Sequence, residues 1–385
     1  MISRRNLLGG MAAAAILPAG SLRAAAQAGP ALTISIALDA GRVLVACSLA
    51  GQGPFFFAMD TGGVVSLIRD DLARRLGLKK RISANLAIGG VSRSYPIYEG
   101  RDFIIGGSLH DKDVALAGTE RVSFGDDVSG SLAAGAMTAF DSELDFGKGE
   151  WRIYRDGIQD RTGYVRLASE IRHYNLANGS AYIFADATLD GKTYRFLLDT
   201  GAPVAARLYG PASRRSGLWD DARPWVPLPA RGDHESRLVR AGSLQIGDTR
   251  FDAPLVVVES GSVGRTEIAD GYIGLPLLRR LNLASDVKTG IMWVQPNRLP
   301  PVPDLYAMSG IWIDRKGDGV VVGQVGRGSP GEHAGVQVGD EIVGERFGPL
   351  IGKLGGRQGG DAPVPLSLRR GGRVLQVTVK PAPYL

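Results

Sequence analysis

The chain has one cysteine, few aromatic residues and no long apolar run after its first 28 positions. A single cysteine among 385 residues, Cys47, excludes an internal disulfide. The apolar runs are short and separated by Gly, Asp and Asn, and the 54 glycines add to a pattern typical of a largely β protein. Four histidines (His110, His173, His234, His333) lack the paired spacing of a metal site, so we expect neither metal nor cofactor.

The chain also lacks a strong excess of charge of one sign. It has 45 Lys and Arg against 39 Asp and Glu, and three of the basic residues lie in the first 28 positions, which carry no acid. The remainder therefore has 42 against 39, a net of +3, which gives little reason to expect a nucleic-acid partner. Neither a nucleophile elbow nor a phosphate-binding glycine loop occurs in its strand-to-helix setting.

The N-terminus is typical of a targeting segment. A short basic start (Met1–Arg5) precedes the apolar stretch Leu7–Leu17, and Ala26-Gln27-Ala28 is a small-x-small cleavage site. Residues 3–8 (SRRNLL) resemble a twin-arginine export motif, with a general secretory signal as the alternative. We expect residues 1–28 to be a signal peptide, and the mature chain to be exported to a bacterial periplasm or the extracellular space without an integral membrane segment.

Two stretches, Phe55–Ile68 (FFFAMDTGGVVSLI) and Tyr194–Leu208 (YRFLLDTGAPVAARL), each place an aspartate between an apolar run and a Thr-Gly pair. The apolar run predicts a buried strand and the glycine a sharp turn. A carboxylate at the end of a buried strand is costly unless it has a partner or a chemical role. Two such carboxylates in matching contexts indicate that each is the partner of the other.

Further landmarks repeat along the chain at nearly the same distance. The aspartates differ by 199 − 60 = 139 positions, the apolar segments ending at Ala133 and Gly274 by 274 − 133 = 141, and the hairpins beginning at Asp145 and Asp286 by 286 − 145 = 141. A nearly constant offset across three landmarks indicates a duplicated domain.

With an apolar-apolar-Asp-Thr-Gly and a later apolar-apolar-Gly occurring twice, residues 31–294 resemble the aspartic peptidases, nearer to the compact retropepsin-like branch. The resemblance implies an all-β, bilobal acid-protease fold. Its two retropepsin-like β-barrel lobes would span residues 29–160 and 161–294, with the active site between them. Because one chain carries both lobes, we expect a monomer with an internal pseudo-two-fold axis.

Two carboxylates held about 3 Å apart cannot both ionise, so they share a proton. One then acts as base towards a water, and the other donates to the carbonyl of a polypeptide substrate. Asp60 and Asp199 are the candidate catalytic residues. The resemblance assigns Thr61 and Thr200 to a brace between the two loops, while Gly62 and Gly201 permit the turns.

The resemblance also implies that a hairpin in each lobe covers the site. By position these hairpins are Ile88–Tyr98 in lobe 1 and Ala230–Ser236 in lobe 2. Tyr95 and Tyr98 are candidates for substrate contact, with ordinary packing as the alternative.

Lobe 1 departs from the family pattern at two positions. Gly63 stands where Ala, Ser or Thr is common, and Ala133 stands where lobe 2 has Gly274. In addition, neither Gly63 nor Ala202 offers a hydroxyl to the carboxylates, so the ionised dyad is less stabilised. We therefore expect a pH optimum less acidic than that of pepsin.

After a proline-rich linker (295–304), residues 305–385 form a third unit. Residues 309–343 resemble a bacterial PDZ domain in a Gly-apolar-apolar strand, a Val-rich strand, a Ser-Pro before a short helix (Pro330–Ala334), and a Val-Gly-Asp turn. PDZ domains bind extended peptides by strand addition, and a β cap without a ligand is the alternative. The expected peptide-binding residues are Ser309, Gly310, Ile311, Trp312 and Ile313.

Together these features predict an exported aspartic-type endopeptidase whose PDZ domain recruits or senses peptide. The alternative is a catalytically inactive, protease-like scaffold that binds peptides. A serine-type protease with a PDZ domain is less well supported, because no Ser-His-Asp arrangement is evident.

Overall fold

A computed structural model describes most of the chain beyond the N-terminal segment. The expected signal peptide lies outside the described residues, as do the tips of both expected hairpins, at 89–90 and 232–233. Among the described residues, no helix has both the length and the apolar composition that a membrane span requires. The described ranges are 30–88, 91–111, 114–120, 125–174, 180–231, 234–261, 268–355 and 362–385.

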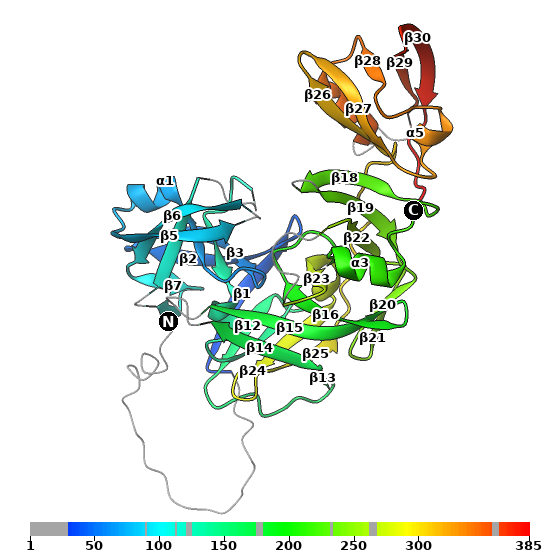
Figure 1. Ribbon diagram of the computed structural model, residues 1–385. Helices are drawn as coiled ribbons and strands as arrows, with labels where there is room; N and C mark the ends of the chain where they lie inside the picture. The colour runs from blue at the N-terminus through cyan, green and yellow to red at the C-terminus, as the bar shows by residue number, and fades with distance from the viewer. Residues whose placement is uncertain are drawn as a thin grey trace, which may run out of the picture.

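The first half of the chain folds into a β lobe, lobe 1 (Figure 1). Cys47 is buried in its second strand. Its first helix has aspartates in the first turn and arginines in the last, which suits the helix dipole, and Gly77 follows with φ +63°. The elements are β1 (Leu32–Asp39), β2 (Arg42–Leu49), β3 (Gln52–Asp60), β4 (Leu67–Arg69), α1 (Asp70–Arg75), β5 (Lys80–Ile88), β6 (Val91–Gly100), β7 (Phe103–Ile105), β8 (Leu109–Asp111), β9 (Val114–Thr119), β10 (Gly130–Ala133), α2 (Ala134–Met137), β11 (Asp141–Asp145) and β12 (Glu150–Tyr154).

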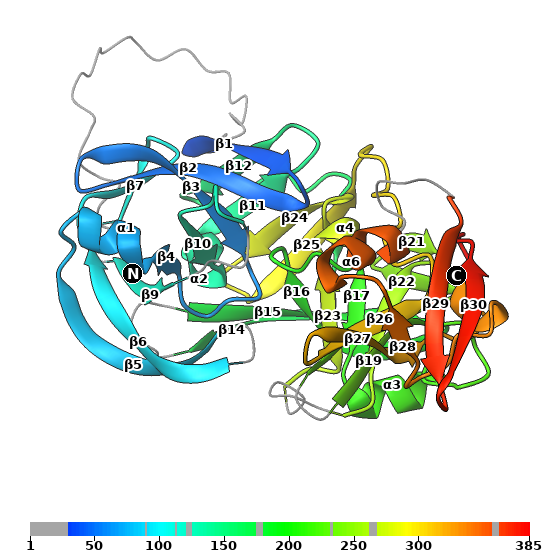
Figure 2. The same cartoon turned by 90° about the horizontal axis from the view of Figure 1, so that it is seen from above.

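The second half repeats this plan as lobe 2, which lies beside lobe 1 in both views (Figures 1 and 2). Its elements are β13 (Val165–Arg166), β14 (Ser169–Tyr174), β15 (Ser180–Leu189), β16 (Lys192–Asp199), β17 (Ala206–Leu208), α3 (Gly210–Ser216), β18 (Val226–Arg231), β19 (His234–Arg240), β20 (Ser243–Ile246), β21 (Thr249–Asp252), β22 (Leu255–Glu259), β23 (Gly271–Gly274), α4 (Leu275–Leu278), β24 (Leu281–Asp286) and β25 (Ile291–Pro296).

Strand pairing shows that the two lobes share one topology. The aspartate strand β3 pairs in parallel with β10, and β16 pairs in the same way with β23. The strand after each Asp-Thr-Gly pairs in parallel with a later strand, β4 with β9 and β17 with β22. The hairpins β5–β6 and β18–β19 then extend these sheets through β9 and β22. The prediction of an all-β, bilobal fold is confirmed.

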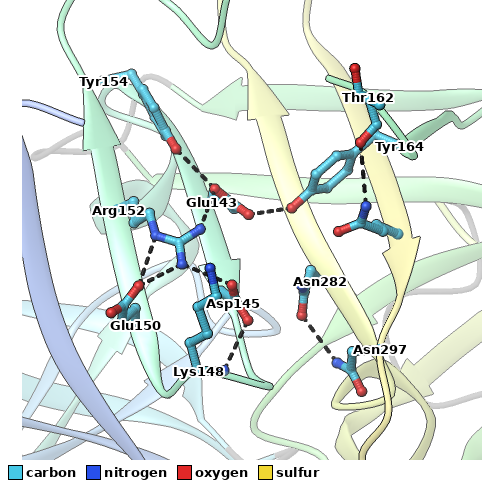
Figure 3. Close-up of polar contacts among 11 residues, drawn as sticks. Glu143, Asp145, Lys148, Glu150, Arg152, Tyr154, Thr162, Tyr164, Asn282 and Asn297 are labelled. Atoms are coloured by element: carbon cyan, nitrogen blue, oxygen red, sulfur yellow. Dashed lines mark hydrogen bonds and ion pairs between the residues drawn. The ribbon is translucent and has the colours of Figure 1, made fainter. Parts of the chain in front are cut away.

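A continuous sheet joins the lobes through the pairing of β11 with β24 (Figure 3). Beside that seam, the buried carboxylate of Glu143 accepts hydrogen bonds from Arg152 and from the hydroxyl of Tyr154, each at 2.9 Å, and from the hydroxyl of Tyr164. Arg152 also pairs with Asp145 at 2.8 Å. Because these groups are largely removed from water, each depends on its partners in this network.

We expect Glu143→Ala to lower the free energy of unfolding by about 3–5 kcal/mol, because it removes one of the two buried carboxylates that pair with Arg152 and leaves the Tyr154 and Tyr164 hydroxyls without their acceptor. Glu150→Ala is the matched control. Its side chain is 35% exposed and contacts the same guanidinium at 2.5 Å, so its loss should cost about 1 kcal/mol or less. Urea unfolding of both variants measures the difference, and equal losses would contradict the assigned importance of Glu143.

The same network predicts a loss of stability in alkali. Burial and the hydrogen bond to Glu143 raise the pKa of Tyr154 to about 12, and the same causes raise the pKa of Tyr164. The native state therefore holds these protons more tightly than the unfolded chain, whose tyrosines titrate near pH 10. The contribution of Tyr154 to stability is complete below about pH 10 and is lost as the pH rises through about 12. Unfolding followed against pH checks this, and Tyr154→Phe should flatten the alkaline decline.

The last part of the chain forms a five-stranded sheet with two helices, here called the C-terminal unit, which lies over lobe 2 in both views (Figures 1 and 2). Ser329 caps the expected short helix by accepting the N–H of Glu332 at 3.1 Å. Beyond residue 343, where the resemblance noted in the sequence ends, the unit continues with a second helix, at Phe347–Gly355, and a strand, at Val364–Arg370. The elements are β26 (Ile311–Lys316), β27 (Gly319–Val325), α5 (Pro330–His333), β28 (Glu341–Val343), α6 (Phe347–Gly355), β29 (Val364–Arg370) and β30 (Arg373–Val379).

Candidate active site

The two Asp-Thr-Gly loops meet between the lobes. A Cβ atom placed on Gly62 would lie 2.2 Å from the carboxyl carbon of Asp199, and one on Gly201 would lie 2.5 Å from Oδ1 of Asp60. The carboxyl group of each lobe therefore sits directly against the glycine of the other lobe. Any larger residue at either glycine would collide with the opposite carboxyl group.

Reciprocal hydrogen bonds between two buried threonines hold the loops together. The Thr61 N–H donates to Oγ1 of Thr200 at 3.1 Å, and the Thr200 N–H donates to Oγ1 of Thr61 at 2.9 Å. Each hydroxyl then donates across the interface, Thr61 to the Leu198 carbonyl at 2.7 Å and Thr200 to the Met59 carbonyl at 2.6 Å. Both side chains are at least 98% buried, so these four bonds are shielded from water.

The aspartates themselves are only partly buried, in contrast to the threonines. Each stands at the last position of its strand, β3 or β16, opposite the last position of the paired strand. The Gly201 N–H donates to Oδ1 of Asp199 at 3.0 Å. The arrangement presents two adjacent carboxyl groups, on a rigid base, to the space between the lobes, where they can share a proton and a water molecule.

The departure at Ala133 has a structural explanation. A Cβ atom on Gly274 would lie 2.0 Å from the Val204 carbonyl oxygen, whereas Ala133 carries its methyl group at the equivalent position. Strand register makes Leu67 and Arg207 equivalent, so the lobe 1 loop spans 67 − 60 = 7 positions and the lobe 2 loop 207 − 199 = 8. The lobe 1 loop is therefore shorter by one residue.

A serine side chain replaces the backbone contact that the shorter loop does not make. The Gly274 N–H donates to the Ala205 carbonyl at 2.9 Å, while the Ala133 N–H donates to Oγ of Ser66 at 3.0 Å. Ser66 lies outside the Asp-Thr-Gly motif, so no sequence pattern identified it as a functional residue. The difference in length between the lobes was signalled by the offset between the repeats, which is 139 at the aspartates and 141 at Ala133 and Gly274.

This contrast predicts different tolerance at the two positions. Gly274→Ala would drive a methyl group into backbone atoms of the Asp199 loop, so we expect a loss of about 1–3 kcal/mol in unfolding free energy and a clear loss of any activity. Ala133→Gly removes one methyl group and should cost about 1 kcal/mol or less. Thermal unfolding measures the loss of stability in both variants. Similar losses would contradict the structural difference between the lobes at these two positions.

A second asymmetry lies beside the lobe 2 loop. Arg207 is 8% exposed and pairs with Glu259, which is 2% exposed, and its Nε donates to the Tyr272 hydroxyl at 2.8 Å. The equivalent of Arg207 in lobe 1 is the apolar Leu67, which pairs with Ser131. The buried residues beside the two loops therefore differ in polarity between the lobes, which the repeat alone did not reveal.

The expected hairpins are present, but the two tyrosines are packed. Tyr95 is buried in an apolar cluster of lobe 1, and the Tyr98 hydroxyl donates to Asp70 at 2.6 Å.

The departure at Gly63 lies beside the dyad. A side chain at this position would crowd the carboxyl group, since a Cβ atom there would lie 3.1 Å from Oδ2 of Asp60. Within the described ranges, no three His, Cys, Asp or Glu side chains gather as metal ligands.

The five residues expected to bind peptide lie where the C-terminal unit meets lobe 2. Ser309 is fully buried, Ile311 and Ile313 are buried, and Trp312 is partly exposed. The Gly310 N–H donates to the Ala307 carbonyl at 3.0 Å, and the Ile311 N–H donates to the Ser309 hydroxyl at 3.2 Å. In the described part of the chain, β26 pairs with β27 alone and so forms an edge of its sheet.

No protein-family model and no curated protein sequence matches the chain. Among solved structures it is similar to edgp, with 9% identity, a TM-score of 0.43, and coverage of 69% of this chain and 94% of that one. It is also similar to an aspartic proteinase from Irpex lacteus, with 12% identity, a TM-score of 0.41, and coverage of 69% and 96%. A retropepsin-like aspartic protease from Rickettsia conorii shows 16% identity and a TM-score of 0.25, with coverage of 34% and 90%. The all-β, bilobal fold itself is established by the strand pairing within and between the lobes.

Proposed function

We propose that the protein is an aspartic-type endopeptidase that hydrolyses peptide bonds in polypeptides. The observation that carries this proposal is the reciprocal packing of each Asp carboxyl group against the glycine of the other loop. That geometry supports a dyad in which the two carboxyl groups share one proton. It also needs no second chain, so the proposed enzyme acts as a monomer.

In the proposed mechanism, one aspartate is ionised and the other is protonated. The ionised carboxylate removes a proton from a water molecule, whose oxygen attacks the peptide carbonyl carbon, while the protonated aspartate donates to the carbonyl oxygen. The tetrahedral intermediate then breaks its C–N bond as a proton passes to the departing nitrogen. The products are a carboxylic acid and an amine, and no covalent bond to the protein forms.

We further propose that the C-terminal unit is a PDZ domain that recruits or senses peptide, and that the N-terminal segment directs export to a periplasm or the extracellular space. The edge position of β26 supports strand addition by an extended peptide. The backbone N–H groups of Gly310 and Ile311 already donate hydrogen bonds, to the Ala307 carbonyl and to the Ser309 hydroxyl, when no peptide is bound.

The test is incubation of the purified mature chain with β-casein, an unfolded substrate, at acidic and neutral pH, with new N-termini identified by mass spectrometry. We expect internal cleavage and an optimum less acidic than that of pepsin, since residues 63 and 202 offer no hydroxyl to the dyad. Absence of cleavage at every pH would overturn the proposal and favour a peptide-binding scaffold.

A further inference from the structure

Trp225, the residue before β18, is bonded to the C-terminal unit through both of its main-chain polar groups. Its N–H donates to the Arg327 carbonyl at 3.2 Å, and its carbonyl accepts a hydrogen bond from the Tyr384 hydroxyl at 3.0 Å. Since β18 begins at the next residue, the start of the lobe 2 hairpin is fixed to the C-terminal unit at its base.

The junction has no spare room at Gly326. A Cβ atom on this glycine would lie 2.2 Å from the Trp225 carbonyl oxygen and 2.9 Å from the Tyr384 hydroxyl. The Gly326 N–H also donates to the Gly310 carbonyl at 2.7 Å. Gly326 thus contacts the hairpin base directly and is bonded to the loop that leads into β26.

The side chain of Trp225 carries the contact to the other strand of the hairpin. The guanidinium of Arg237, on β19, lies over the rings of both Trp225 and Trp219, at 4.3 and 4.2 Å from their centroids. Arg237 also pairs with Asp221 at 2.5 Å. Cation–π contacts with both rings orient the guanidinium, so a displacement of Trp225 moves both β18, which it precedes, and β19, which carries Arg237.

An apolar cluster extends this junction towards the candidate active site. Its buried members include Val226, Val257 and Tyr306, and the C-terminal residues Tyr384 and Leu385 pack against it. Val204 packs against the same cluster and belongs to the loop that follows Asp199. The end of the chain and the lobe 2 catalytic loop therefore share one apolar cluster.

In the described part of the chain, the corresponding cluster of lobe 1 has no residue of the C-terminal unit packed against it. Among the described residues it consists of side chains from lobe 1 alone, including Leu67, Tyr95 and Ala117, with Val65 in the position that Val204 holds in lobe 2. Two hairpins of the same topology therefore differ in one respect: among the described residues, side chains of the C-terminal unit pack on the apolar cluster of β18–β19 and none packs on that of β5–β6.

We propose that the contact among Trp225, Gly326 and Tyr384 couples the peptide-binding edge of the C-terminal unit to the hairpin of lobe 2, so that a peptide bound along β26 regulates the lobe 2 half of the peptidase site. The bound peptide and the effect on hydrolysis rest on the proposed function, whereas the mechanical contact between the C-terminal unit and the lobe 2 hairpin does not. A bound peptide that shifts the Ser309–Gly310 loop also shifts Gly326, because the Gly326 N–H donates to the Gly310 carbonyl. Since no free space separates Gly326 from the Trp225 carbonyl, Trp225 is displaced in turn.

Gly326→Ala tests the coupling because its methyl group meets Trp225 and Tyr384 outside the core of the C-terminal unit. Gly352→Ala is the matched control, since a Cβ atom at Gly352, in the same unit, meets nothing within 4 Å. Hydrogen exchange of the full chain, read by mass spectrometry, compares β18–β19 with β5–β6. We expect exchange in β18–β19 to be roughly threefold faster or more in Gly326→Ala and unchanged in the control, with β5–β6 unchanged in both.

Tyr384→Phe removes one hydroxyl group and keeps the ring, so it tests the same contact with less risk to folding. It should accelerate exchange in β18–β19 in the same direction by a smaller factor. Unchanged exchange in both Gly326→Ala and Tyr384→Phe would overturn the coupling.

Hydrolysis of β-casein separates the coupling from the proposed function. We expect Gly326→Ala to change the rate by roughly threefold or more relative to Gly352→Ala. A wild-type chain that cleaves nothing would refute the proposed function while the exchange data still decide the coupling. Faster exchange with equal hydrolysis in the two variants would refute the regulatory role alone.

Discussion

Asp60→Asn and Asp199→Asn are each expected to reduce hydrolysis of β-casein by about 10³-fold or more, because an amide neither accepts the proton of the attacking water nor donates to the carbonyl as a carboxylic acid does. The substitution preserves the shape of the side chain. The contacts of each carboxyl group with the glycine of the opposite loop should therefore remain, and the fold should be retained.

The matched control is Asp318→Asn, an exposed aspartate in the turn between β26 and β27, which should leave the rate unchanged. Circular dichroism and thermal unfolding establish that each variant is folded. Cleavage at more than a tenth of the wild-type rate in either active-site variant would remove the paired-aspartate mechanism, even if the protein proves to be a peptidase.

The threonine brace gives the second large expected effect. Thr61→Val and Thr200→Val each keep the shape of the side chain but remove a hydroxyl that donates one hydrogen bond and accepts another across the lobe interface. The partners left behind are buried backbone groups, so we expect each variant to lose about 2–4 kcal/mol of unfolding free energy. Misplacement of the dyad should also reduce hydrolysis by about 10- to 100-fold.

Thr61→Ser and Thr200→Ser are the controls, because serine keeps the hydroxyl and loses one methyl group. They should stay within about 1 kcal/mol of the wild type and keep most of the activity. Denaturant unfolding and initial cleavage rates provide both readouts. If valine and serine variants behaved alike, the brace would contribute little to either stability or geometry.

The duplicated architecture was predictable because its signals are local. Strand-ending aspartates, glycine turns and short apolar runs depend on neighbouring residues, and their repetition at nearly constant offset identified two lobes of one topology. The short helix at Pro330 was predictable for the same reason, since Ser329 and Glu332 cap it within one turn. Residues 346–372 were not predicted, although the apolar positions of α6 follow helical spacing and those of β29 alternate as in a strand, because this stretch is rich in glycine. These apolar side chains pack with the first strands of that unit.

Lobe 1 shows where local signals fall short. Ala133 looked like a defect in the motif, but the shorter loop after Asp60 leaves space for its methyl group and Ser66 supplies the missing acceptor. Tyr95 and Tyr98 looked like candidates for substrate contact, but their environment is set by strands and a helix distant in sequence. In each case the deciding neighbour lies more than 20 positions away.

Two β lobes, each with an aspartate at the end of a strand, could be inferred from the sequence because periodicity and turn chemistry act over a few residues. The structure adds the individual hydrogen bonds of the Thr61–Thr200 brace that the family resemblance implied. It also reveals two contacts that no sequence pattern indicated, the pairing of Arg207 with Glu259 in lobe 2 and the hydrogen bond from Tyr384 to Trp225. These contacts join residues 52 to 159 positions apart. Such pairings depend on how complete sheets pack, which no local pattern encodes.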